Sequence, residues 1–294
     1  MPTTHLDDRA LVEIGGADAE HFLQNLITTD LDSLRAGEAK PGALLSPQGK
    51  ILFDFLVSRH GESFVLDIRK DIAEDLLKRL TLYKLRARVE MAKRDREGVA
   101  VSWQDDSSAS DSVSPASETG AGLRDTRFIG PMTVTRFHGE SVPPATASQE
   151  DWHEFRVRNG IPESGFDYAL GEVFPHDALL DQLDGVGFRK GCYVGQEVVS
   201  RMQHRGTARR RFLIASSQAR LPASGATVTA AGKPSGTLGT AAGGRALALV
   251  RMDRIKDALD ANAPILADEA TLDLTIPAWA RFDFPADASA SDDA

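Results

Sequence analysis

The sequence predicts an α+β protein whose C-terminal part is a small antiparallel β-barrel or sandwich. Before Arg211, apolar runs with strand-like alternation are mixed with segments whose apolar residues recur at helical spacing. After Arg211, short strand-like runs follow one another between Gly and Pro turns. A chain of 294 residues is long enough for two or three domains and for a sizeable core.

The first half of the chain is expected to alternate strands with helices. Strands are predicted over residues 10–14, 42–46, 51–58 and 64–68. Asp18 is placed to cap a helix whose apolar residues extend to Leu26. Asp71 is placed to begin a second helix, which runs past Leu80 into "YKLRARVEM".

The second half is expected to contain two polar stretches, one helix and the strand-rich C-terminal part. Residues 105–122 are rich in Ser, Asp, Ala and Gly and are predicted to form a mobile surface loop. The second polar stretch, "SVPPATASQED", contains prolines and precedes Trp152. "WHEFRVRNGIP" is predicted to be helical up to Gly160. The later strands are predicted over residues 212–215, 226–230, 236–240, 246–250 and 271–276, and the acidic tail "DASASDDA" is expected to fray.

Composition excludes several classes of protein. The net charge of −9 argues against a general nucleic-acid binder, and no apolar run approaches the length of a membrane span. The first residues carry Asp7 and Asp8 and lack the apolar segment of a signal peptide. One cysteine makes neither an internal disulfide nor a metal site within one chain. We therefore expect a cytoplasmic protein with no metal site of its own.

The single cysteine lies in "KGCYVGQE", between two glycines and close to two cations. Lys190 and Arg189 favour the thiolate form of Cys192, and flanking glycines leave a backbone open to a partner. The alternative is a small apolar residue buried in a turn, since free cysteines are usually buried. Spacing alone does not decide between a reactive and a structural cysteine.

Asp54 stands out within the predicted strand "KILFDFLVS". The alternation places it between Leu52 and Leu56 on one face of the strand. A carboxylate there either lies at the edge of a cavity or belongs to an ion pair. Apolar surroundings raise the pKa of a carboxyl, which suits acid–base work or the binding of a ligand N–H.

Three other stretches carry charges that suit anion or ligand binding. "RMQHRGTARRR" holds five arginines and a histidine, so it forms either a local anion site or a solvated linker. In "VFPHDALLD", Pro175 can open a helix, and Asp177 then lies near the helix N-terminus. Tyr83 to Arg86 end the earlier helix, where cations are favourable in any case.

Taken together, these stretches resemble one protein family. "KGCYVGQE" looks like the signature of the YgfZ-type folate-binding proteins, the group that includes the mitochondrial iron–sulfur assembly factor of the Caf17 type. The other similar stretches follow in the expected order along nearly the whole chain: "GADAEHFLQNLITTD", "LLSPQGKILFDFLV", "YKLRARV", "RVRNGIP", "GVGFRKGCYVGQEVVSRMQHRG" and "LGTAAGGRALALVRMD". The resemblance is weakest over residues 100–150.

The resemblance implies a fold related to the glycine-cleavage T-protein, a tetrahydrofolate-dependent aminomethyltransferase. Such a fold has three subdomains in a ring around a central folate site. The first would comprise residues 1–50 plus 145–206, the middle one residues 51–144, and the third, a β-barrel, residues 207–294.

The resemblance also implies roles for single residues. The residues expected to line a tetrahydrofolate cavity are Asp54, Tyr83, Arg86, Asp177, Gln196, Glu197, Arg205 and Arg209. Asp177 would accept hydrogen bonds from the pterin, Tyr83 would stack on the ligand, and Arg205 or Arg209 would meet the glutamate tail. Asp54 falls where the transferase has its catalytic aspartate, but Phe53 replaces the first carboxylate of that pair.

The function implied is a folate-binding, non-enzymatic factor for assembly or repair of iron–sulfur proteins. Cys192 would be the reactive thiol, and Lys190 would lower its pKa. Because one thiolate cannot hold a cluster, an A-type iron–sulfur carrier or a client iron–sulfur protein would supply the other ligands. The alternatives are a one-carbon transferase that depends on Asp54, and a thiol redox sensor without folate.

Overall fold

A computed structural model describes residues 1–105 and 122–285, and these form two compact units. Unit 1 comprises Met1–Trp152, Leu170–Pro175 and Leu183–Arg201. The rest of the chain, His153–Ala169, His176–Gln182 and Met202–Ala294, forms unit 2. The predicted mobile loop, apart from its end residues, and the predicted frayed tail lie outside the described residues.

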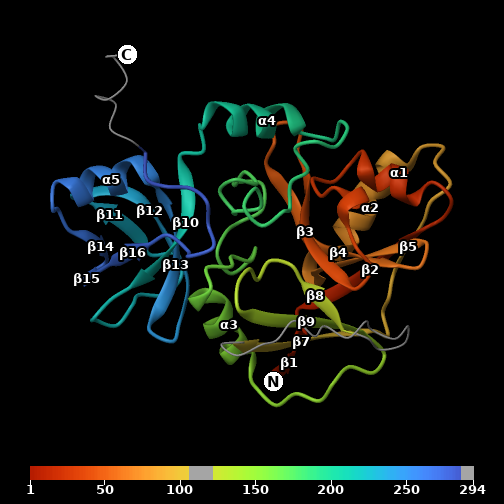
Figure 1. Ribbon diagram of the computed structural model, residues 1–294, viewed down its shortest axis with the longest axis horizontal. Coiled ribbons are helices and arrows are strands. Elements are labelled where there is room, and N and C mark those ends of the chain that lie inside the picture. Colours follow the sequence, from red (N-terminus) through yellow and green to blue (C-terminus); the bar gives the residue numbers. More distant parts are fainter. Residues whose placement is uncertain (106–121, 286–294) are drawn as a thin grey trace. The chain divides into compact units, whose positions relative to one another are not determined.

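Unit 1 is built on one sheet, in which the described residues form nine strands (Figure 1). The spatial order is β1-β7-β9-β8-β3-β4-β5-β2-β6, and all neighbours are antiparallel except β3 and β8. The strands are β1 (Thr3–His5), β2 (Arg9–Gly15), β3 (Glu38–Leu45), β4 (Ile51–His60), β5 (Ser63–Arg69), β6 (Glu90–Lys93), β7 (Gly98–Asp105), β8 (Leu123–Asp125) and β9 (Met132–Gly139). Two helices lie entirely within this unit, α1 (Ala19–Gln24) and α2 (Ala73–Lys84), with two short 3₁₀ turns, Leu31–Ser33 and Lys70–Ile72.

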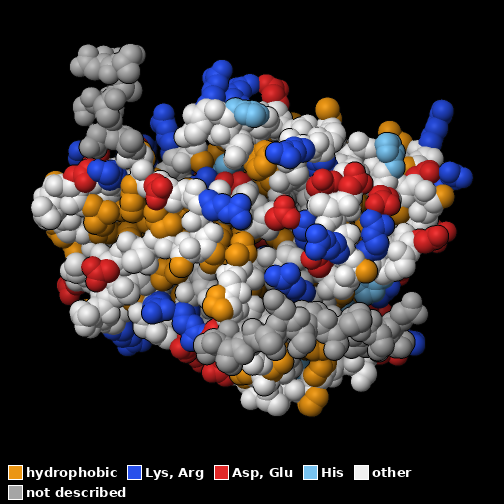
Figure 2. All heavy atoms as spheres, viewed as in Figure 1, with side chains coloured by type: hydrophobic (Ala, Val, Ile, Leu, Met, Phe, Trp, Pro, Cys, Tyr) orange, Lys and Arg blue, Asp and Glu red, His pale blue; other side chains and the backbone are white. Residues whose placement is uncertain are grey.

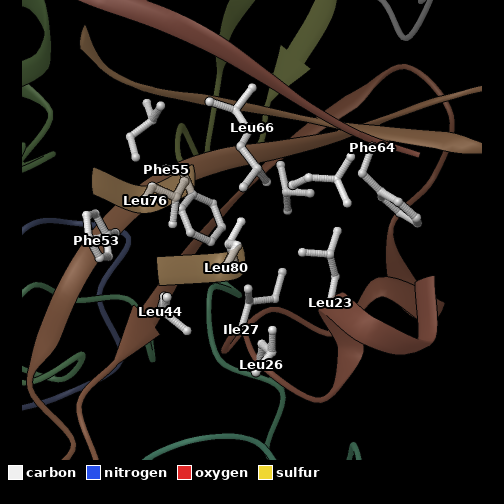
Figure 3. Close-up of a cluster of buried hydrophobic side chains, with 14 of the residues drawn as sticks. Leu23, Leu26, Ile27, Leu44, Phe53, Phe55, Phe64, Leu66, Leu76 and Leu80 are labelled. Atoms are coloured by element: carbon white, nitrogen blue, oxygen red, sulfur yellow. The ribbon is translucent and has the colours of Figure 1, made fainter. Parts of the chain in front are cut away.

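The main core of unit 1 lies between this sheet and the two helices (Figure 3). Period-two alternation in β4 points Phe53, Phe55 and Val57 into the core, while Leu56 joins a separate cluster with Ala39 and Leu123. The other members of the core come from β2, β3 and β5 and from the inner faces of α1 and α2, as Leu23, Leu44, Leu66, Leu76 and Leu80 illustrate. The strand over 51–58 is therefore confirmed, but Leu52, predicted to face away from the core, packs against it.

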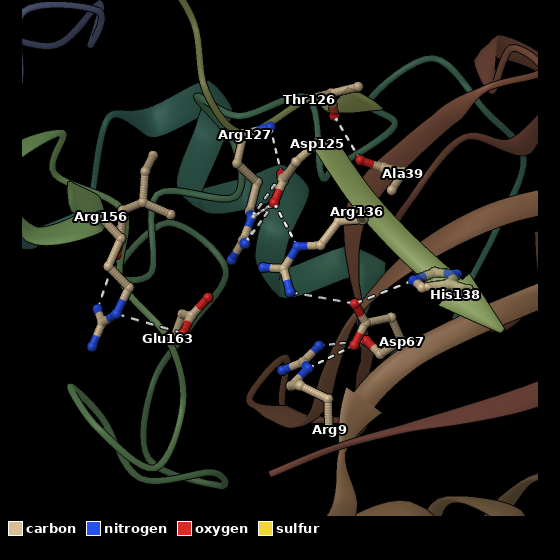
Figure 4. A network of polar contacts seen from close by, with 11 residues as sticks. Arg9, Ala39, Asp67, Asp125, Thr126, Arg127, Arg136, His138, Arg156 and Glu163 are labelled. Carbon is tan, nitrogen blue, oxygen red and sulfur yellow. Dashed lines mark hydrogen bonds and ion pairs between the residues drawn. The ribbon is translucent and has the colours of Figure 1, made fainter. Parts of the chain in front are cut away.

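Buried charges brace the opposite side of the sheet (Figure 4). Asp67 on β5 accepts a 2.6 Å hydrogen bond from Arg9 Nε, and its Oδ2 lies 3.5 Å from Arg136 Nη1 on β9. Arg136 in turn contacts Asp125 on β8, which also pairs with Arg127. Three strands separate β5 from β9 in the sheet order, so a contact between them requires a strongly curled sheet.

Unit 2 contains an antiparallel sheet of seven strands among its described residues. The spatial order is β15-β14-β11-β12-β13-β10-β16. The strands are β10 (Arg210–Ser216), β11 (Thr227–Ala230), β12 (Lys233–Ala242), β13 (Arg245–Arg251), β14 (Ile265–Ala267), β15 (Ala270–Thr271) and β16 (Asp273–Thr275). Helix α5 (Met252–Asp260) packs on the apolar face, and apolar side chains also reach the surface where α5 and β11 lie (Figure 2).

Two helices contain a boundary between the units. Helix α3 (Gln149–Arg158) begins in unit 1 and continues in unit 2, and so does helix α4 (Gln196–Arg205). Residues 1–50 and 51–144 contribute to the same sheet of unit 1, and the division into three subdomains stays a prediction. None of the described helices combines the length and the hydropathy needed to cross a membrane.

One predicted element is wrong. Pro175 does not open a helix, because residues 175–184 form a series of turns. Leu179 and Asp184 have φ angles of 61° and 58°, which a continuous α-helix does not allow. Asp177 therefore does not lie at a helix N-terminus.

Candidate functional site

The stretch "KGCYVGQE" forms an ordered loop on unit 1 that displays its cysteine. Cys192 and Gly191 are exposed, whereas Tyr193 is buried. A Cβ added to Gly191 would meet no atom within 4 Å, so there is open space next to the cysteine. The structure thus rules out the buried structural cysteine that the sequence left open.

Lys190 anchors the loop on the side that precedes the cysteine. Its ammonium donates hydrogen bonds to the carbonyl oxygens of Ile27 and Thr29, at 2.9 and 2.7 Å. Burial lowers the pKa of Lys190 to about 8, although Asp30 and Asp32 act in the opposite direction. The ammonium is therefore engaged by the backbone, and its predicted effect on the pKa of the Cys192 thiol stays a prediction.

Two glycines fix the loop on the side that follows the cysteine. Gly195 has a φ of 79°, and a Cβ there would lie 2.6 Å from the carbonyl oxygen of Ser46. Gly49 also has a φ of 79°, and a Cβ there would lie 2.9 Å from Cβ of Val198. Because both glycines are needed for the close approach of two backbones, the loop is seated on the β3–β4 turn.

Tyr193 and Val194 attach the centre of the loop to unit 1. Burial raises the pKa of Tyr193 to about 12, and its ring centroid lies 5.4 Å from Lys190 Nζ. Val194 packs against the main core of unit 1, as do Leu52 and Tyr83. Contacts before and after Cys192 therefore hold the loop. They fix the position of the thiol on the surface of unit 1.

The other predicted residues of unit 1 lie on three separate elements. Asp54 lies on β4 and is half-buried, between Leu52 and Leu56 as the alternation predicts. The last turn of α2 carries Tyr83, which is half-buried against the core, and Arg86 follows this turn and is exposed. Gln196 and Glu197 begin α4, where Glu197 pairs with Arg201. The folate contacts predicted for these residues stay predictions.

In unit 2, Asp177 already has a cationic partner. Its side chain is only 3% exposed, and its Oδ2 accepts a 2.6 Å hydrogen bond from Arg210. The adjacent Arg211 pairs with Asp181 in the same way, also at 2.6 Å. Part of the basic run thus neutralises buried carboxylates, while Arg205 and Arg209 are exposed.

A cavity of about 320 Å³ lies beside these ion pairs within unit 2. Its walls include His176, Gln203, Arg211, Met252, Arg281 and Phe282. His176 Nε2 lies 3.1 Å from Gln203 Oε1, and burial lowers the pKa of this histidine. Sequence reasoning missed this cavity, because its walls come from segments far apart along the chain.

The described residues contain no group of three or more His, Cys, Asp or Glu side chains that could hold a metal ion. Cys192 is therefore a single potential ligand on the surface of unit 1. A metal or cluster bound through this thiol would need ligands from another molecule.

Comparisons with known proteins support the predicted resemblance. A family profile described as "CAF17, C-terminal beta-barrel domain" matches residues 209–282. The chain is 32% identical over 282 residues to "Iron-sulfur cluster assembly factor IBA57, mitochondrial" of Mus musculus, a match that covers 86% of this chain and 78% of that protein. It is 31% identical over 299 residues to the protein of the same name from Homo sapiens, with 93% and 84% covered.

The fold is similar to that of a solved enzyme. The structure matches the glycine cleavage system aminomethyltransferase T from Bartonella henselae with a TM-score of 0.69. The match covers 95% of this chain and 86% of that chain, at 14% sequence identity. The predicted T-protein fold with a C-terminal antiparallel barrel is thus confirmed, and at this identity the likeness concerns the fold alone.

The predicted cytoplasmic location is wrong. Both relatives carry names that place them in the mitochondrion. The scarcity of cysteine indicated a reducing environment, which does not identify a compartment. The folate-binding YgfZ type of the predicted resemblance stays a prediction.

Proposed function

The chain belongs to the family of IBA57 iron–sulfur cluster assembly factors, and on this premise we propose that it binds a cluster-carrying partner protein through the thiolate of Cys192. Its relatives are named assembly factors, which supports a role outside catalysis. The partner we propose is an A-type iron–sulfur carrier or a client iron–sulfur protein. The iron–sulfur cluster is the cargo of the pair.

The observation that carries this proposal is the exposed Cys192 on a loop that is anchored on both sides. Thiolate is the ligand that iron–sulfur clusters favour, and a fixed loop brings it to a partner without a large ordering cost. One thiolate leaves most coordination positions of a cluster open. The partner therefore supplies the remaining ligands, and the cluster bridges the two proteins.

Anaerobic reconstitution tests this proposal. The full chain is mixed with an A-type carrier, iron and sulfide, and the cluster is followed by its visible absorption and by its co-elution with both proteins. Cys192→Ser should abolish the shared cluster. Gly191→Ala is the matched control, because it alters a neighbouring exposed position with open space around it and keeps the thiol.

A shared cluster that forms equally well with Cys192→Ser would refute the role of the thiol. Loss of the cluster in both variants would show that the conformation of the loop matters rather than the sulfur. Circular dichroism and the unfolding midpoint of each variant exclude a general loss of structure.

Tetrahydrofolate is the small-molecule ligand that we include in the proposal, and the residues fit it only in part. Half-buried Asp54 between two leucines suits the binding of a ligand N–H. Asp177 does not fit the role of pterin acceptor, because its carboxylate is buried and paired with Arg210. A fluorescence titration with tetrahydrofolate tests binding, and Asp54→Asn should weaken it while Asp177→Asn should act mainly on stability.

A further inference from the structure

The end of α2 exposes two leucines on the surface of unit 1. Leu82 is 70% exposed and Leu85 is 89% exposed, more than any other large apolar side chain of the described residues. Single exposed leucines are ordinary on protein surfaces. Two strongly exposed leucines three residues apart at one helix end are less ordinary and are more typical of a contact surface.

The core does not need these two leucines. The inner face of α2 buries Leu76 and Leu80, and Leu77 and Tyr83 pack against the same core. The hydrophobic effect thus holds the helix on the sheet through its inner face. Leu82 and Leu85 contribute nothing to that packing.

The backbone of Leu85 has a conformation that is unfavourable for leucine. Leu85 ends the helix with a φ of 45° and a ψ of −106°. Glycine is the residue that adopts such a positive φ without cost, and asparagine is the next best. A leucine here is unfavourable both for the backbone and for its exposed side chain.

The two leucines lie in a stretch of the sequence that is rich in cations. The stretch from Lys78 to Arg88 contains five Lys or Arg and no Asp or Glu, in a chain whose net charge is −9. In the part of the chain that the structure describes, Arg79, Lys84 and Arg86 form no ion pair. Favourable interaction with the helix dipole explains cations in the last turn, but it does not explain Arg79 or the leucines.

We propose that Leu82, Leu85, Arg79, Lys84 and Arg86 form a docking surface, the α2 surface, for an acidic face of the cluster-carrying partner. The inference rests on the proposed function, since the partner is the protein that supplies the other cluster ligands. The leucines fill an apolar hollow on that face, and the cations meet carboxylates around it.

The position of the α2 surface suits this role. Tyr83 of α2 and Val194 of the cysteine loop pack against one core, so both contact regions rest on the same rigid support. The partner can then be held by α2 and meet the thiol with little loss of conformational entropy.

An anionic membrane is the other kind of surface that leucines among cations can bind. Asp18 beside Arg88 and exposed Glu90 border the stretch. These carboxylates would face a broad anionic bilayer, whereas the limited face of a protein can leave them in water. The charges therefore favour a protein.

The test measures binding of the full chain to an A-type carrier protein, by calorimetry at low and at moderate salt. Leu85→Gly should weaken binding about tenfold, because a buried leucine contact is lost. The same change should leave the unfolding midpoint equal or higher, because glycine relieves the positive φ. Loss of affinity without loss of stability is the result that a merely structural leucine would not give.

Matched variants separate the α2 surface from general effects of charge and apolar area. Arg86→Glu should weaken binding and flatten its salt dependence, while Arg96→Glu, at an exposed position on the β6–β7 turn, should do neither. Leu82→Ala should weaken binding, while Leu259→Ala on α5 of unit 2 should not.

The outcomes separate a failure of the α2 surface from a failure of the proposed function. If Leu85→Gly and Arg86→Glu bind the carrier like the wild type, the α2 surface is refuted, and a cluster that still requires Cys192 leaves the proposed function intact. If the wild type neither binds the carrier in calorimetry nor forms a shared cluster with it, both fail. If Leu85→Gly instead reduces binding to phosphatidylserine vesicles and leaves carrier binding unchanged, the occupant is a membrane and the inference is wrong.

Discussion

At the scale of single residues, two stacked histidines, His60 and His138, lie next to the buried charges of unit 1. The two rings stack with centroids 6.2 Å apart, and His138 Nε2 lies 3.5 Å from Asp67 Oδ2. Burial lowers the pKa of His60, and His138 and Arg94 add repulsion in the same direction. The nearby carboxylates of Glu13 and Glu97 act against this lowering without reversing it.

The aspartates of the same network respond to pH in another range. Burial alone would raise the pKa of Asp67, but Arg9, His138 and Arg136 outweigh it and hold that pKa far below its usual value. The pKa of Asp125 is also lowered, chiefly by Arg127 against the effect of burial. Their stabilisation is present above the pKa of an unfolded aspartate, about 4, and is lost only at lower pH.

We predict that stability falls as the pH decreases from about 7.5 to about 5, and that His60→Gln reduces this fall. An unfolded histidine binds its proton near pH 6.5, and folded His60 binds it only at lower pH, so protonation favours the unfolded chain. Urea unfolding at several pH values gives the slope. Part of the slope should persist in His60→Gln, because burial also lowers the pKa of His176.

His204→Gln is the matched control, because His204 is exposed and its side chain stays in water in both states. This variant should keep the slope of the wild type. An unchanged slope for His60→Gln would show that His60 does not couple folding to pH.

At the scale of elements, the cysteine loop depends on how closely it approaches the β3–β4 turn. Gly195→Ala should lower the unfolding midpoint by about 3 °C or more, because alanine is strained at a φ of 79° and its Cβ would meet the carbonyl of Ser46. It should also reduce formation of the shared cluster. Calorimetric unfolding and the reconstitution measure the two effects.

Gly191→Ala is again the control, because it has space around it and should change neither property. Equal midpoints for the two alanine variants would contradict the tight seating of the loop. A lower midpoint for Gly195→Ala with full cluster formation would show that the loop tolerates movement.

Regular elements could be predicted from the sequence where one pattern dominated. The alternation in 51–58 placed Asp54 and Phe55 on opposite faces, as the structure has them. Helix α5 was missed because its surroundings contain strand after strand, although Met252, Ile255 and Ala258 recur at helical spacing and are buried. The helix predicted after Pro175 does not form, because Leu179 and Asp184 have positive φ angles.

The sequence allowed us to predict that Cys192 lies on an open loop. It did not allow us to predict which residues form hydrogen bonds with the charged side chains near it and in unit 2. The glycines around Cys192 indicated an open loop, which needs only local information. The hydrogen bonds of Lys190 to carbonyls about 160 residues earlier, and of Arg210 to Asp177, depend on pairs that no local pattern links. The sequence showed the charges in "RMQHRGTARRR", but only the fold shows which of them are neutralised.

At the scale of the whole molecule, unit 2 is larger than the barrel that the family profile covers. The profile spans residues 209–282, while unit 2 also includes His153–Ala169. Within that segment Arg156 is fully buried and donates 2.6 Å hydrogen bonds to Asp167 and to Thr240 of β12. Residues 153–169 thus pack against the barrel and form a hydrogen bond with β12.

Further contacts join this segment to the end of the barrel. Trp279 Nε1 donates a 2.7 Å hydrogen bond to the carbonyl of Asn159, and Tyr168 packs near Phe212 with ring centroids 6.1 Å apart. Gly160 has a φ of 71° and lies so close to Pro277 that a side chain would not fit. These contacts lie within unit 2, so they stabilise it independently of unit 1.

We therefore predict that a fragment of residues 153–294 unfolds at a temperature at least about 10 °C higher than a fragment of residues 207–294. The shorter fragment loses the charged hydrogen bonds that Arg156 and Asp167 form with Thr240 of the barrel, which together are worth about 3 kcal/mol. Circular dichroism during heating measures both midpoints. In the longer fragment, Arg156→Met should give an intermediate midpoint and exposed Glu269→Gln an unchanged one. Equal midpoints for the two fragments would mean that the barrel is complete without the segment and that its buried arginine serves another purpose.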